Sequence, residues 1–194
     1  MSRTELQKIL FLHLWYSFFF LGLVSPVFAD SSIDTPWRIL DTKHTAIHYH
    51  AINDLNKFNN NIDYSFSSMG LEWLFKKKNP EDIEHEIILK VDAVYEKVQE
   101  ILDMRTSMEK VTIYISHDKQ ELHSFYQKIF KTPCHLRAWY VYDLNAIYIN
   151  VDDIHEGILA HEIAHSIIDH YLLVRPPKAT VEILARYVDG HLFD

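Results

Sequence analysis

Three stretches of the chain place apolar residues at helical spacing. The first begins at residues 79–82 (Asn-Pro-Glu-Asp), which supply a cap, a proline in the first turn and acidic residues behind it. Its apolar positions continue to about residue 103 and predict one long helix. The second stretch predicts a helix from about residue 153 to 172. The third predicts a helix from about residue 180 to Gly190, a residue type common at helix ends, and two prolines at 176–177 separate these last two helices.

Alternating apolar and polar residues predict four strands. Residues 45–51 and 111–116 each predict one strand, and residues 138–151 predict a hairpin with a short turn. His48 and His50 lie on the same face of the first strand. Two histidines at this spacing can bind a metal, but no third ligand is close in sequence, so we expect a solvated strand face.

The remaining segments predict one short helix and two irregular regions. Ser116 or Asp118 is expected to cap a helix that runs to about Phe130. Residues 30–42 are polar and predict a lead-in without regular structure. Residues 54–61 are rich in Asn and Asp and predict a loop.

Composition and charge narrow the class of protein. The chain has 194 residues, of which 48% are hydrophobic and 24% charged, values that fit one globular domain. The formal net charge is -8 and no long basic run is present, so nucleic acid is not an expected partner. The single cysteine, Cys134, allows no intrachain disulfide, and we expect it to be a small, partly buried residue.

The first 29 residues have the layout of a secretory signal peptide. Arg3 and Lys8 give a basic start, an apolar run follows to about Val24, and residues 27–29 (Val-Phe-Ala) form a small-x-small cleavage signal. We therefore expect export to the periplasm or the medium of a bacterium, with one mature domain over residues 30–194. The alternative is an uncleaved membrane anchor, but the apolar run is short for a spanning helix.

The sequence His161-Glu162-x-x-His165 lies inside the second helical stretch. On a helix, His161 and His165 lie one turn apart on one face, so both imidazoles can reach one metal ion. Glu162 is rotated by about 100° around the helix axis, beside the metal, where a general base can accept a proton from the attacking water. The other face of this helix is apolar. A buried helix needs partners for two histidines, and shared metal ligation supplies them.

A third metal ligand is expected from another element, because a catalytic zinc takes three protein ligands and keeps one position for water. Glu182 is the candidate, since the two prolines let the last helix pack back on the motif helix. The alternative for Glu182 is a surface ion pair with Arg186, one turn later. Asp169 lies one turn past His165 and could ligate the metal or support a ligand, whereas His170 is expected at the surface.

These features together resemble the gluzincin metallopeptidases, and most closely the small bacterial peptidase-MA-like domains, including minimal gluzincins. The resemblance rests on the motif, the proline-containing spacer, the helix from Glu182 into Ala185 and Tyr187, and the preceding hairpin, and it covers about residues 111–190. It implies an α+β, zincin-like fold with a small twisted mixed sheet, a backing helix, an active-site helix and a C-terminal ligand helix. The edge strand of that sheet would hold an extended peptide. The resemblance also implies these site residues: His161, His165 and Glu182 as ligands of one Zn²⁺ per chain and Glu162 as the base.

Two positions depart from the gluzincin pattern. Ile183 follows Glu182, where such proteins often have Gly, and Arg186 stands where they often have an acid that orients the first histidine. Asp169 and Asp189 are the acids that could take its place.

The expected function is an exported zinc-dependent metallopeptidase that hydrolyses peptides or proteins. The short chain after Glu182 leaves no room for a large second lobe, so we expect a shallow groove. The candidate oxyanion donors are Tyr140, Tyr142, Tyr187 and His191. One alternative is a catalytically silent zinc-binding exported domain with a binding or assembly role. A second is a protein without metal in which the motif arose by chance.

Overall fold

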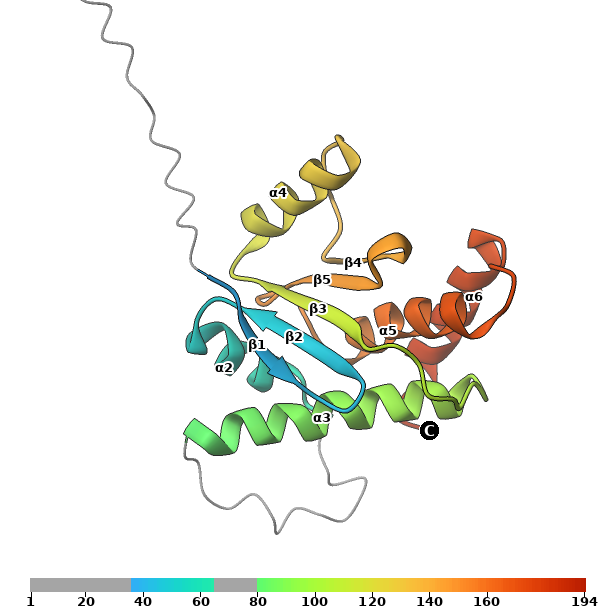
Figure 1. The fold of residues 1–194 in the computed structure, drawn as a ribbon, viewed down its shortest axis with the longest axis horizontal. Coiled ribbons are helices and arrows are strands. Elements are labelled where there is room, and N and C mark those ends of the chain that lie inside the picture. Colours follow the sequence, from blue (N-terminus) through green and yellow to red (C-terminus); the bar gives the residue numbers. More distant parts are fainter. Residues whose placement is uncertain (1–35, 65–79) are drawn as a thin grey trace, which may run out of the picture. The chain divides into compact units, whose positions relative to one another are not determined.

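A mixed sheet of five strands organises the part of the chain that this computed structural model describes, residues 36–64 and 80–194. The sheet confirms the expected α+β class. Its spatial order is β1-β2-β3-β5-β4, so β5 lies between β3 and its own hairpin partner (Figure 1). The three central strands run parallel and both edge strands run antiparallel to their neighbours. The strands are β1 (Arg38–Asp41), β2 (Thr45–Tyr49), β3 (Val111–Ser116), β4 (Ala138–Val141) and β5 (Ala146–Asn150).

The predicted signal peptide, residues 1–29, lies outside the described residues. Within the described ranges, no helix is long and apolar enough to cross a membrane.

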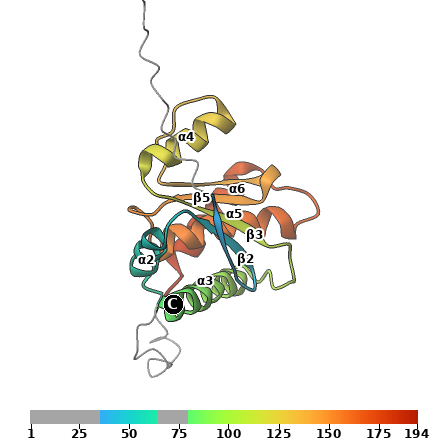
Figure 2. The same ribbon diagram turned by 60° about the vertical axis from the view of Figure 1, so that its left-hand side comes forward.

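Helices cover the two faces of the sheet unequally (Figures 1 and 2). The larger core joins Ile113, Ile147 and Ile149 of the sheet to helices on one face. The smaller core lies on the other face, where Trp139 and Tyr148 pack beneath a single helix. The helices of the larger core are α2 (Ile52–Asn61), α3 (Pro80–Ile101), α5 (Glu156–Tyr171) and α6 (Lys178–Gly190), and α4 (Lys119–Phe130) covers the smaller one.

Two segments differ from the sequence-based expectation. Residues 54–61 are not a loop but most of helix α2, because Leu55 and Phe58 are buried at helical spacing and Asp54 bonds back to the Ala51 N–H. The polar lead-in contains strand β1, whose pairing with β2 provides its backbone partners. Only Leu40 of β1 is buried, so the sequence of this edge strand shows no alternation of apolar and polar residues that would predict it.

The hairpin and the helices after it were predicted within a few residues. Asp118 caps α4 by accepting the N–H of Glu121 at 2.8 Å. Helix α5 begins at Glu156 rather than 153, and α6 begins at Lys178 rather than 180. Cys134 is buried.

Asn145 closes the hairpin in the left-handed conformation, with φ 42°, which asparagine tolerates better than most residues. Its side-chain oxygen accepts the Ser166 hydroxyl of α5 at 2.8 Å and the Tyr140 hydroxyl of β4 at 3.5 Å. Its amide nitrogen donates to the Lys110 carbonyl at 3.3 Å. One turn residue therefore contacts the edge strand, the motif helix and the start of β3.

The solvated strand face expected at His48 and His50 is wrong. Both side chains are only partly exposed, because His48 packs on Tyr114 with ring centroids 4.8 Å apart and His50 stacks on Trp37 at 3.7 Å. Burial accordingly lowers the pKa of His48. These histidines belong to an aromatic layer on the α4 side of the sheet.

His117 and Asp54 supply a pH-dependent part of the stability. Asp54 is buried, and its carboxylate accepts the His117 Nδ1–H at 2.6 Å, which raises the pKa of His117. A raised pKa in the folded state means that the pair stabilises fully below about pH 6.5 and that this stabilisation is lost as the pH rises through the folded value. Because His117 is more than half exposed, we expect the His117→Ala variant to lose at most about 1 kcal/mol at pH 5.5 and less at pH 8.5. Urea unfolding at both pH values measures this, and exposed His135→Ala is the control; an equal loss at both pH values would contradict it.

Candidate metal centre

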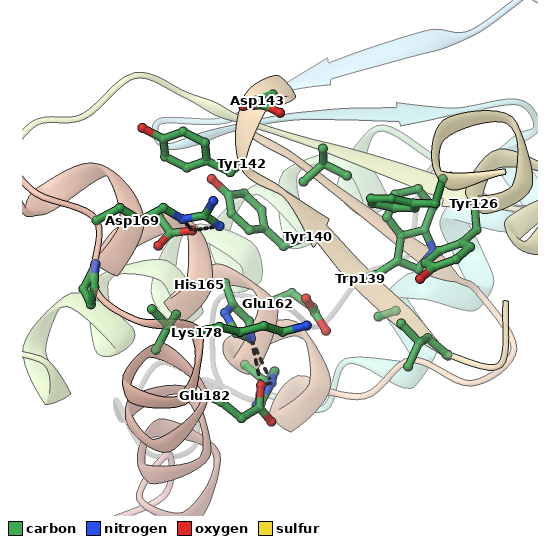
Figure 3. Close-up of a pocket in the computed structure, with 18 residues that line it drawn as sticks. Tyr126, Trp139, Tyr140, Tyr142, Asp143, Glu162, His165, Asp169, Lys178 and Glu182 are labelled. Carbon is green, nitrogen blue, oxygen red and sulfur yellow. Dashed lines mark hydrogen bonds and ion pairs between the residues drawn. The ribbon is translucent and has the colours of Figure 1, made fainter. Parts of the chain in front are cut away.

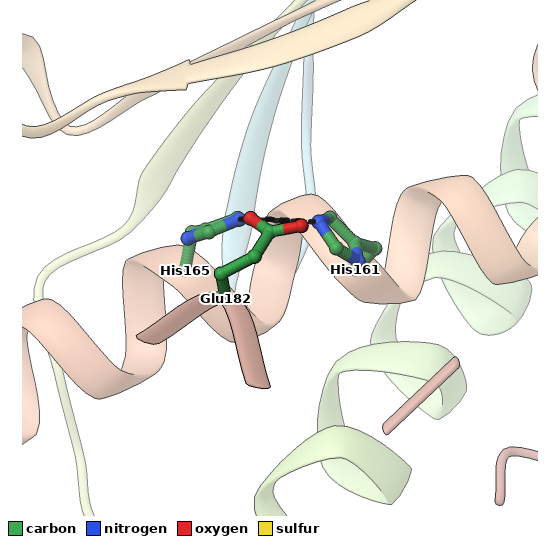
Figure 4. A group of neighbouring side chains, drawn as sticks. All are labelled: His161, His165 and Glu182. Atoms are coloured by element: carbon green, nitrogen blue, oxygen red, sulfur yellow. Dashed lines mark hydrogen bonds and ion pairs between the residues drawn. The ribbon is translucent and has the colours of Figure 1, made fainter. Parts of the chain in front are cut away.

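Helix α5 is mostly buried, and its two motif histidines are among its partly exposed residues. Leu159, Ile163 and Ile167 are fully buried against the sheet and α3, whereas His161 and His165 are half-buried. Their rings meet edge to face, with the two Nε2 atoms 3.2 Å apart (Figure 4). The apolar pattern of the helix therefore directs both imidazoles to one open side.

Helix α6 brings Glu182 to the same side. Val181, Ala185 and Val188 form a buried stripe at helical spacing, and it packs α6 against α5. Glu182 lies next to this stripe, and its Oε2 atom is 3.6 Å from His165 Nε2 and 3.9 Å from His161 Nε2 (Figure 4). One ligand atom from each of the three residues lies within 4.8 Å of the others.

This cluster fits a zinc ion. Tetrahedral zinc with nitrogen ligands at about 2.0–2.1 Å separates those ligands by about 3.3 Å. The histidine pair already has this separation, and the carboxylate would have to move by less than about 1 Å to match it. Burial, together with the neighbouring His161, lowers the pKa of His165 to about 4, so its imidazole is neutral and can ligate at neutral pH.

Glu162 lines the same hollow as the cluster and is only 8% exposed (Figure 3). Burial, and next the negative charge of Glu182, raise its pKa to about 8. A cation at the cluster would offset both effects and favour the carboxylate. A buried carboxyl group with this tendency suits a general base near neutral pH.

Glu182 makes the expected ion pair with Arg186 and also faces the two motif histidines. Arg186 Nε donates to Glu182 Oε1 at 3.0 Å, while Oε2 faces the two histidines. Asp169 is buried but accepts two bonds from Arg175, at 2.8 and 3.1 Å, and is not part of the cluster. Among the contacts of the described residues, neither Asp169 nor Asp189 bonds to His161 or His165, so no acid replaces the one that gluzincins often carry.

A groove of about 670 Å³ runs past the cluster along the edge strand β4. Tyr140, Tyr142 and Asp143 line one end, and Tyr126 and Trp139 line the other (Figure 3). The cluster and Glu162 line the same groove. The groove can therefore hold an elongated ligand across the cluster.

The four residues proposed as oxyanion donors differ in whether they line the groove. Tyr140 lies next to His165, with nearly parallel rings 6.4 Å apart, and burial raises its pKa, so its hydroxyl stays protonated. Its hydroxyl also lies 2.8 Å from Nε2 of the exposed His170. Tyr187 and His191 instead stack on each other at 4.0 Å and do not line the groove. Tyr140 is thus the best placed of the four candidates.

Several groove residues were missed from the sequence. Phe130, Leu136, Arg175 and Lys178 line the groove but lie on three separate segments. Only Arg175 carries a local signal, because it directly precedes the two prolines that turn the chain towards α6.

The geometry offers three side chains that could hold a metal ion, a buried carboxyl group beside them and an open groove. No acid, base or nucleophile outside these residues is needed for metal-assisted hydrolysis. Comparison with known proteins found no match for this chain among protein-family models, curated proteins or solved structures.

Proposed function

We propose that the chain is a zinc-dependent peptidase of the gluzincin type with a zincin-like fold. The observation that carries the proposal is the convergence of His161, His165 and Glu182 from two helices, with ligand atoms within 4.8 Å of one another. A chance motif would not require a carboxylate from a separate helix at the same point. The buried Glu162 beside the cluster adds the base that hydrolysis needs.

In this proposal each residue has one role. His161, His165 and Glu182 would hold a zinc ion, and this ion would supply Lewis acidity for attack by water on the substrate carbonyl. Glu162 accepts the proton of the attacking water and delivers it to the leaving amine. Tyr140, held protonated, would move its hydrogen bond from Asn145 to the developing oxyanion.

The position of β4 at the edge of the described sheet supports a peptide as the substrate. The Asn150 N–H donates to the Arg137 carbonyl at 3.2 Å, which makes these two residues a hydrogen-bonded antiparallel pair. Because such pairs alternate, Trp139 and Val141 direct their backbone groups to β5, and Ala138 and Tyr140 direct theirs outward. An extended peptide can therefore pair with β4 beside the cluster.

Export through the N-terminal segment remains part of the proposal, with action in the bacterial periplasm or medium on peptides or proteins. The net charge of -8 gives no support to a nucleic-acid partner.

A silent zinc-binding domain is the second candidate, and one observation favours it. Arg186 occupies the position of the orienting acid and holds one oxygen of Glu182 at 3.0 Å. This places a positive charge near the cluster, which would weaken the basicity that an acid normally adds to the ligands.

Metal analysis and hydrolysis of the purified protein test the proposal. We expect about one zinc per chain and cleavage of an unstructured peptide mixture that a chelator abolishes and added zinc restores. Zinc without cleavage would support the silent domain. Absence of stoichiometric zinc would contradict both the peptidase and the silent zinc-binding domain.

A further inference from the structure

The groove has an aromatic end that the proposed chemistry does not use. Tyr126 and Phe130 of α4 meet Trp139 of β4 edge to face, with ring centroids 5.3 and 5.7 Å apart. Leu136, on the segment between α4 and β4, lines the same end. This end is apolar, whereas the opposite end carries Asp143 and the guanidinium of Arg175.

Part of this aromatic surface is open. Trp139 is buried, with 4% of its surface exposed, but Phe130 and Leu136 remain 43% and 48% exposed. Their apolar surface lines the groove instead of being covered by the core. Large apolar side chains in the wall of a groove are the usual contact for an apolar group of a ligand.

The register of β4 connects this end to the cluster. Trp139 belongs to the core beneath α4, whereas Tyr140 points to the α5 side and lies next to His165. Directly opposed residues of paired strands place their side chains on the same face of the sheet. In a peptide paired with β4, the residue opposite Tyr140 therefore faces the cluster. Its chain neighbour opposite Trp139 points to the α4 side, towards Phe130.

We propose that the aromatic end is a specificity subsite that binds one large apolar or aromatic side chain of the peptide substrate. This inference rests on the proposed function. The selected residue is the chain neighbour of the residue that faces the metal cluster. Phe130 and Leu136 form the open walls of the subsite, and Trp139 forms its base.

Peptides that carry a single Phe, moved one position at a time along an Ala-Ser background, test the subsite. Cleavage is mapped by mass spectrometry, and binding is measured by calorimetry with the same peptides. We expect cleavage at a fixed distance, within about two residues of the Phe, because neighbouring residues of a strand alternate between the two faces. We also expect kcat/KM and affinity roughly 10- to 100-fold higher than for the peptide without Phe.

Variants assign the preference to the aromatic end. Phe130→Ala is expected to remove most of the Phe preference, in both binding and kcat/KM, while zinc content stays the same. Leu136→Ala is a second variant of the open wall. Ile129→Ala is the matched control, since Ile129 is 36% exposed on the same helix but does not line the groove.

The results separate the subsite from the peptidase function. Cleavage without a fixed distance from Phe, or a preference unchanged in both wall variants, overturns the subsite and leaves the peptidase. A binding preference that Phe130→Ala removes, without any cleavage, supports the subsite and rejects the peptidase. Zinc-loaded protein that neither binds nor cleaves the peptides rejects both.

Discussion

Replacing Glu162 with glutamine is expected to lower peptide hydrolysis by at least about 100-fold while zinc remains bound. Glutamine keeps the size of the side chain but cannot accept the proton of the attacking water. The variant should fold, because burial already disfavours the charged form of Glu162 and a neutral amide fits the same space. Initial rates on a fluorogenic peptide and zinc content by elemental analysis measure the two effects.

Glu156→Gln is the matched control, since Glu156 lies on the same helix and bonds the Asp63 N–H outside the cluster. The hydrolysis rate of Glu156→Gln should stay within about 2-fold of the wild-type rate. The substitution lies away from the site and changes the stability of the fold only slightly. If Glu162→Gln keeps the wild-type rate, another group is the base and the assigned mechanism is wrong.

Zinc is expected to raise the melting temperature of the wild-type protein by about 10 °C, and His165→Ala should abolish this rise. A ligand present at about 1,000 times its Kd stabilises the folded state by about 4 kcal/mol, and each kcal/mol shifts the midpoint of a domain of this size by about 2–4 °C. The effect depends on His165 because the cluster joins α5 to α6 through its three ligands. Thermal unfolding of chelator-treated protein with and without added zinc measures it.

His170→Ala serves as the control for this measurement. His170 lies on the same helix but is exposed and outside the cluster, so its variant should retain the full rise. A rise of equal size in His165→Ala would mean that zinc stabilises the protein from a different site.

The pattern of the sequence predicts the elements around the cluster well because their signals are local. The hairpin consists of two runs rich in aromatic and β-branched residues around a short turn, and α5 shows helical spacing between a strand and two prolines. His161 and His165 are placed by the helix alone. Glu182 required the further expectation that α6 packs back on α5, and the structure brings it within 3.6 Å of His165.

The features that could not be predicted depend on distant partners. Helix α2 is stabilised by burial of Leu55 and Phe58 in the common core, which outweighs the weak helix preference of its asparagines. Strand β1 exists because β2 provides its hydrogen-bond partners. The place of β5 between β3 and β4 follows from long-range pairing, and the groove follows from that order because it leaves β4 at the edge. From the sequence, metal ligation and the ion pair with Arg186 were alternative interpretations of Glu182. In the structure one carboxylate oxygen contacts Arg186 and the other faces His165, so the two contacts do not exclude each other.

The three contacts of Asn145 determine the width of the groove from outside it. One wall of the groove is β4, reached through the Tyr140 hydroxyl, and the opposite wall is α5, reached through Ser166, the residue that follows His165. The same amide is tied to the Lys110 carbonyl at the start of β3, so neither wall can shift alone without breaking one of these bonds. The spacing between β4 and the His161–His165–Glu182 cluster is therefore controlled by a side chain outside the cluster, and a change at Asn145 would alter this spacing while leaving the three cluster residues in place.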